Sequence, residues 1–145
     1  MGRQFSSKFF LRLAGAWLLM VNAGHTWGYY GAFVTRDLLD DSRNAAYELM
    51  KEPMDGGIFN ASFWTVLQML ALQLTFFLAF SAILSFWIAR MPDSHIHAGF
   101  ARICTLIFGF ALLAFVFVHP QIHAAIIAVG AMAFFLLAWW RACHN

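Results

Sequence analysis

Charged residues are scarce in this sequence. Asp, Glu, Lys and Arg make up 11% of its 145 residues and apolar residues 62%, whereas a soluble domain carries about 25% charged residues. An ordinary cytosolic domain is therefore excluded. Nine basic and seven acidic residues leave a net charge of +2 without a basic run, which excludes a disordered tail and a nucleic-acid-binding domain. The composition indicates an integral membrane protein.

Cysteine and catalytic motifs are also lacking. The two cysteines, Cys104 and Cys143, form no C-x-x-C pair, so a disulfide-exchange enzyme is excluded. No G-x-S-x-G, H-E-x-x-H or phosphate-loop motif occurs. The long apolar runs hold no Asp, Glu, Lys or Arg near their middles. Because pumps and proton-coupled carriers place movable charges there, a transporter is disfavoured.

The uncharged runs predict four membrane-spanning helices. A helix needs about 20 mainly apolar residues to cross a bilayer, and the predicted spans are about 11–33, 60–88, 99–118 and 121–141. Pro120 separates the last two, because proline favours the start of a helix and a non-helical residue before it. The first span resembles a secretory signal, but its apolar character continues to Phe33, so we expect it to be retained. The predicted fold is all-α, a four-helix bundle in one domain, 1–145.

The distribution of charge predicts how the bundle is oriented. Basic residues at the two termini and in the second loop give that side a net charge of +5, and the first loop carries −3. The predicted inner basic residues are Arg3, Lys8, Arg12, Arg90, Arg102 and Arg141. Both termini are therefore expected to be cytoplasmic. In the first loop, apolar residues at helical spacing between Leu38 and Met50 predict a short amphipathic outer helix, either a lid or a plain connector.

Polar residues of the outer half form the candidate site. Three- and four-residue spacings place Asn22, His25 and Tyr29 on one helix face, and Trp64 and Gln68 on another. The turn between the last two spans adds His119 and His123. Three interpretations stay open: a structural network with a bond from His25 to Gln68, a pocket for a lipid-, quinone- or sterol-like ligand, and a haem or metal site formed by His25, His119 and His123. No cofactor is otherwise indicated.

Two further patterns have structural interpretations. Asp93 or Ser94, after Pro92, is expected to cap the third span, with His95 and His97 titrating in its first turn without a role. Helix association is expected to use small residues. The corresponding lines are Gly24-x-x-x-Gly28, the line Ala101, Thr105 and Gly109, and the pair Ala124 and Ala128.

Short motifs in the first 90 residues suggest a family. Asn22-Ala23-Gly24-His25, Glu48-Leu49-Met50-Lys51 and Ser62-Phe63-Trp64 resemble an uncharacterised family of small bacterial four-span membrane proteins. The resemblance implies an inner-membrane location and carries no activity. Membrane-associated eicosanoid and glutathione enzymes share the size, but their charged second-helix motif is missing between Gly56 and Ala89.

The expected function is therefore non-catalytic. The sequence favours a scaffold or accessory subunit that packs against the lipid bilayer and against partner proteins, as a homo-oligomer or in a larger membrane complex. The alternative is a protein that binds an apolar ligand, or acts on one, in the outer half of the bundle.

Overall fold

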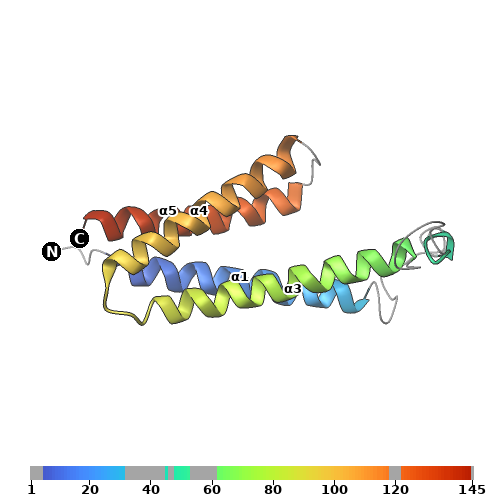
Figure 1. Cartoon of the computed structure of the whole chain (residues 1–145), viewed down its shortest axis with the longest axis horizontal. Coiled ribbons are helices and arrows are strands. Elements are labelled where there is room, and N and C mark those ends of the chain that lie inside the picture. The colour runs from blue at the N-terminus through green and yellow to red at the C-terminus, as the bar shows by residue number, and fades with distance from the viewer. Residues whose placement is uncertain (1–4, 32–44, 46–47, 53–61, 118–121, 145) are drawn as a thin grey trace. The chain divides into compact units, whose positions relative to one another are not determined.

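The structure, a computed structural model, describes residues 5–31, 45, 48–52, 62–117 and 122–144, with the side chain of His123 excepted. Four long helices occur in this part of the chain: α1 (Ser7–Tyr29), α3 (Phe63–Ile88), α4 (Ser94–Phe117) and α5 (Ile122–His144) (Figure 1). Helices make up 91% of the described residues, which include no strand. The all-α prediction is confirmed.

Three segments are long and apolar enough to cross a membrane, namely Phe63–Ile88, Ser94–Phe117 and Ala124–His144. They correspond to the second, third and fourth predicted spans. Helix α1 occupies the predicted first span but contains Lys8 and Arg12, and its membrane crossing stays a prediction. Of the predicted outer amphipathic helix, Glu48–Met50 are helical and the Lys51 ammonium lies 3.0 Å from the Glu48 carboxylate. Ala45 is helical too, and the rest of that segment lies outside the described residues.

Polar side chains define where the helices begin. The Ser6 hydroxyl accepts a hydrogen bond from the Phe9 backbone N–H at 3.4 Å and so caps α1, which begins four residues before the predicted span. Ser62 caps α3 in the same way, through the Thr65 N–H at 3.2 Å. Asp93 caps α4, because its carboxylate accepts the His95 N–H at 2.7 Å. The predicted Asp93 cap is thus observed.

The chain divides into two compact units. Unit 1 comprises 1–21 and 79–145, and unit 2 comprises 22–78, so both α1 and α3 contribute to each unit. Each of the four helical segments in unit 1 buries a stripe whose members alternate at spacings of three and four residues. These stripes are Ser7, Leu11, Ala14 and Leu18; Ala82, Ser85 and Ala89; His97, Ala101, Cys104 and Phe108; and Ala128, Ala131, Phe135, Ala138 and Ala142. This period is that of helices packing at a shallow crossing angle.

The core of unit 1 is centred on Phe135. This ring is fully buried on α5, stacks on Phe108 with centroids 5.8 Å apart, and meets the edge of Phe100 at 5.8 Å. The remaining stripe members of α5 are alanines. Small side chains let helix backbones approach closely, which is how helices associate where lipid supplies no hydrophobic drive.

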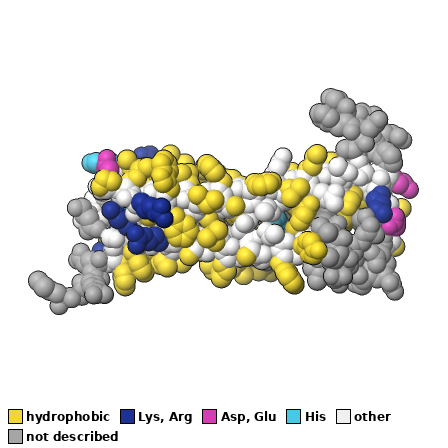
Figure 2. Space-filling model, turned by 90° about the horizontal axis from the view of Figure 1, so that it is seen from below, with side chains coloured by type: hydrophobic (Ala, Val, Ile, Leu, Met, Phe, Trp, Pro, Cys, Tyr) yellow, Lys and Arg dark blue, Asp and Glu magenta, His cyan; other side chains and the backbone are white. Residues whose placement is uncertain are grey.

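Large apolar side chains cover the outer faces of the helices (Figure 2). Phe76 is 70% exposed on α3 and Phe110 is 71% exposed on α4. A surface this apolar is unfavourable in water and suited to hydrocarbon. The helices therefore present to their surroundings the surface of a membrane protein.

Candidate functional site

In unit 2, the polar residues of α1 share one half-buried face. Asn22, His25 and Tyr29 are partly buried, whereas Trp27 on the opposite side is 76% exposed. The predicted face is therefore present, and its position follows from the helical period.

His25 ties α1 to α3 within unit 2. Its Nε2 lies 3.1 Å from the carbonyl oxygen of Ala71, and because a carbonyl only accepts, Nε2 carries the proton and donates. The Thr75 hydroxyl donates to the same oxygen at 3.0 Å. The sequence led us to expect Gln68 as the partner of His25, but its Nε2 proton goes to the backbone instead. The methyl side chain of Ala71 is small enough to let an imidazole reach this carbonyl.

Asn22 leaves one polar atom unsatisfied in unit 2. Its Oδ1 is buried and has no hydrogen-bond partner among the described residues, while its backbone carbonyl accepts the Thr26 hydroxyl at 2.7 Å. A buried acceptor without a donor costs about 1–3 kcal/mol. Such an atom is ready to accept a hydrogen bond from a hydroxyl group.

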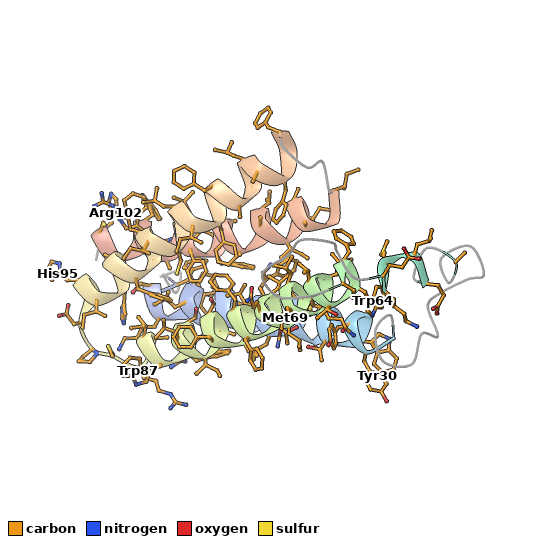
Figure 3. The ribbon with its side chains drawn as sticks, turned by 45° about the vertical axis from the view of Figure 1, so that its right-hand side comes forward. Tyr30, Trp64, Met69, Trp87, His95 and Arg102 are labelled. Atoms are coloured by element: carbon orange, nitrogen blue, oxygen red, sulfur yellow. The ribbon has the colours of Figure 1, made fainter. Side chains whose placement is uncertain are left out.

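The other predicted site residues fall into two groups. Trp64 and Gln68 are half-buried, and their spacing places them on the α3 face that also carries Ala71. Figure 3 labels Trp64 near the start of this helix. His119 lies outside the described residues, as does the side chain of His123 on α5. The structure therefore brings His25 beside the α3 face and does not test the two remaining histidines. Within the described ranges, no three His, Cys, Asp or Glu side chains gather in a metal-binding group.

Unit 1 contains a histidine whose role the sequence analysis missed. His97 is 1% exposed and its ring lies among α1, α3 and α4. Its Nδ1 is 3.1 Å from the Ser7 hydroxyl, and its Nε2 is 3.1 Å from the Ile88 carbonyl and 3.0 Å from the Met91 carbonyl. The expectation that both histidines of this turn lack a role is therefore wrong for His97. The side chain of His95 is exposed.

The hydrogen bonds of His97 close the end of α3. Its Nε2 must carry a proton because both of its partners are carbonyls. The last carbonyls of a helix have no intrahelical donor. The Ile88 carbonyl accepts the Met91 backbone N–H at 3.0 Å, and the His97 ring adds a second donor there and serves the Met91 carbonyl just beyond the helix. In the neutral ring, Nδ1 then accepts the Ser7 hydroxyl proton. One side chain thus joins the start of α1, the end of α3 and the first turn of α4.

A third tie joins α1 to α5 in unit 1. The Trp17 indole Nε1–H donates to the Ile127 carbonyl at 3.2 Å, and its ring meets the edge of Phe134 at 6.3 Å. This approach depends on Gly130, where a Cβ atom would lie 2.6 Å from the Trp17 ring. The predicted glycine motif shows no such packing, since a Cβ at Gly24 or Gly28 would meet no described atom within 4 Å.

Comparison of the chain with models of known protein families, with curated proteins and with solved structures gave no match.

Proposed function

We propose that this chain is a non-catalytic integral membrane protein, a scaffold or accessory subunit that packs against lipid and against a partner protein or further copies of itself. One observation carries the proposal. Trp17, His25 and His97 each donate a hydrogen bond from a ring N–H to a backbone carbonyl in another helix or at the end of one. These polar groups therefore hold the helices together, which suits a rigid framework.

The proposed location is the bacterial inner membrane, with four spans and both termini cytoplasmic. The excess of basic residues at the termini and in the second loop supports this orientation. The resemblance to small bacterial four-span proteins supports the location, and the length and hydropathy of three helices support the membrane itself.

Photo-crosslinking in native membranes tests the scaffold role. A photoreactive phenylalanine analogue replaces Phe76 or Phe110, whose side chains are 70% and 71% exposed, so neither change disturbs a buried side chain. We expect protein adducts of defined mass at one or both positions, because a scaffold buries part of its apolar surface against protein. The same variants in vesicles of lipid alone are the control for partner adducts. Lipid adducts only, at both positions and in both preparations, would contradict the proposal.

A second candidate function rests on the unsatisfied Oδ1 of Asn22. A hydroxyl-bearing amphiphile of the lipid, quinol or sterol type would donate a hydrogen bond to this atom while its apolar part lies along α1 and α3. Tyr29, Trp64 and Gln68 belong to the same proposal as contacts, because they share the half-buried faces of those helices.

Ligand retention distinguishes this second candidate from the first. We expect His25→Ala to reduce any co-purified amphiphile severalfold without loss of helix content, because the His25 bond to Ala71 positions the Asn22 face. Organic extraction of the purified protein followed by mass spectrometry measures retention. Gln73→Leu is the matched control, because Gln73 is exposed on α3. An unchanged ligand content in His25→Ala would exclude the pocket.

A further inference from the structure

The helix ends of unit 1 that meet at His97 carry a concentration of positive charge. Unit 1 contains six basic residues and one acidic residue in its sequence. We call the described basic residues of this unit the basic end: Lys8, Arg12, Arg90, Arg102 and Arg141. Figure 2 shows Lys and Arg side chains gathered together toward one end of the visible face.

Packing contacts bring three of these cations together. His97 bonds to Ser7, which precedes Lys8, and to the carbonyls of Ile88 and Met91, which flank Arg90. Arg12 follows Lys8 by one helical turn and so lies on the same face of α1. The two helices approach closely here, because a Cβ at Gly15 would lie 2.9 Å from the Phe86 ring of α3. Lys8, Arg12 and Arg90 therefore flank one contact between helices.

No acidic side chain neutralises these cations within the described part of the chain. The single acid of unit 1, Asp93, is exposed and its carboxylate caps α4. Lys51 of unit 2 differs from these cations, because its ammonium lies 3.0 Å from the Glu48 carboxylate and is neutralised by it. Like charges held close together repel one another, so an external anion would stabilise the arrangement.

Apolar side chains next to the cations indicate what carries that anion. Trp87 and Ile83 lie on one face of α3, and are 56% and 64% exposed. Arg90 follows the end of this helix, three residues after Trp87. At the start of α1, Phe5 and Phe9 are 53% and 38% exposed and stack at 4.5 Å. A free phosphate ion would use the cations alone. A phospholipid would use both, with its headgroup at the cations and its acyl chains along the apolar side chains.

We propose that the basic end is a docking surface for anionic phospholipid headgroups, centred on Lys8, Arg12 and Arg90. Arg141 extends this surface on α5, since its guanidinium lies 4.6 Å from the centroid of the Trp140 ring and its buried Nε has no described partner. An indole and a guanidinium side by side match the boundary between acyl chains and headgroups. This inference does not depend on the scaffold role.

Lipid titration of the full chain in zwitterionic detergent tests the proposal. Dioleoylphosphatidylglycerol is added, and native mass spectrometry measures the lipid bound, with dioleoylphosphatidylcholine and inorganic phosphate as parallel arms. We expect preferential binding of phosphatidylglycerol that weakens with added salt. Equal retention of the two lipids would overturn the proposal. Full displacement of phosphatidylglycerol by an equal concentration of inorganic phosphate would show recognition of the free ion, and would overturn it too.

Charge removal identifies the residues responsible. The triple variant Lys8→Gln, Arg12→Gln, Arg90→Gln is expected to bind phosphatidylglycerol about a hundredfold more weakly, since each cation near a membrane surface contributes about fivefold. Lys51→Gln is the matched control, because its charge is already paired with Glu48. The charge-retaining variant Lys8→Arg, Arg12→Lys, Arg90→Lys is expected to bind as the unchanged chain does.

Single changes keep the test decisive. If the triple variant does not fold, Arg90→Gln alone replaces it, with an expected weakening of about fivefold. Unchanged affinity in the folded charge-removal variant, or an equal loss in Lys51→Gln, would overturn the assignment.

Discussion

His97→Ala is expected to lower the free energy of unfolding by about 2–4 kcal/mol. The change removes the printed donor of the Met91 carbonyl, one of the two donors of the Ile88 carbonyl, and the partner of the Ser7 hydroxyl, at a site where the imidazole is 1% exposed. An unsatisfied buried polar group costs about 1–3 kcal/mol, and the cavity left by the ring adds to it. Reversible unfolding in lipid–detergent bicelles, followed by tryptophan fluorescence, measures the loss.

The same turn supplies a matched control for this prediction. His95 lies two residues earlier and is exposed, so His95→Ala is expected to change stability by less than about 0.5 kcal/mol. Ser7→Ala is expected to cost about 0.6 kcal/mol, the typical strength of a side-chain bond between membrane helices. The double variant of Ser7 and His97 should lose less stability than the sum of the two single losses, because both changes break the same bond. Equal stability of His97→Ala and His95→Ala would show that the hydrogen bonds of His97 contribute nothing to the free energy of unfolding.

The role of His97 could have been inferred from its position in the helical period. His97, Ala101, Cys104 and Phe108 follow one another at spacings of four, three and four residues, which is the stripe that α4 buries. His95 is out of phase with that stripe by about half a helical turn. The short H-x-H spacing makes the two histidines look like a local pair in one environment, although they lie on opposite sides of the helix.

The helices themselves could be predicted because their signals are local. Long uncharged runs gave α3, α4 and α5 to within a few residues, and the cap at Asp93 followed from its place after Pro92. The predicted first span began four residues after α1 does. Hydropathy locates the part of a helix suited to hydrocarbon, whereas the helix starts at the Ser6 cap.

The candidate site could be predicted only as far as side-chain periodicity reaches. Spacing placed Asn22, His25 and Tyr29 on one face, as the structure shows. The acceptor of His25 could not be predicted, because every residue carries a backbone carbonyl and the one at Ala71 is selected by how the two helices pack. Gln68 was predicted instead because only side-chain partners can be recognised in a sequence.

Close helix contacts were equally hard to place from sequence. The glycine motif at Gly24 and Gly28 meets no described neighbour, whereas Gly15 and Gly130, which belong to no motif, lie against large aromatic rings. Which ring meets which glycine depends on residues about 70 to 110 positions away in the chain. Such pairs become visible only in three dimensions, and Gly130 with Trp17 is the tightest of them.

Gly130→Ala is therefore expected to destabilise the protein, although alanine is the better helix former. The new Cβ would lie 2.6 Å from Trp17 Cε2, so the indole must move and its 3.2 Å bond to the Ile127 carbonyl must stretch or break. Overpacking of this kind costs about 1–3 kcal/mol, against a gain of about 1 kcal/mol from helix propensity. Unfolding in bicelles measures the net change.

Gly109→Ala separates these two contributions. A Cβ at Gly109 would meet only the Met132 sulfur, at an ordinary contact distance of 3.7 Å, so this variant gains helix propensity without a clash. The difference in unfolding free energy between the two alanine variants isolates the overpacking, and we expect about 1–3 kcal/mol. Adding Trp17→Phe removes the indole ring atoms that clash, and Gly130→Ala should then cost less than in the unchanged chain. If Gly130→Ala were as stable as Gly109→Ala, Trp17 would not rest against α5, and the Trp17 tie would not hold α1 in unit 1.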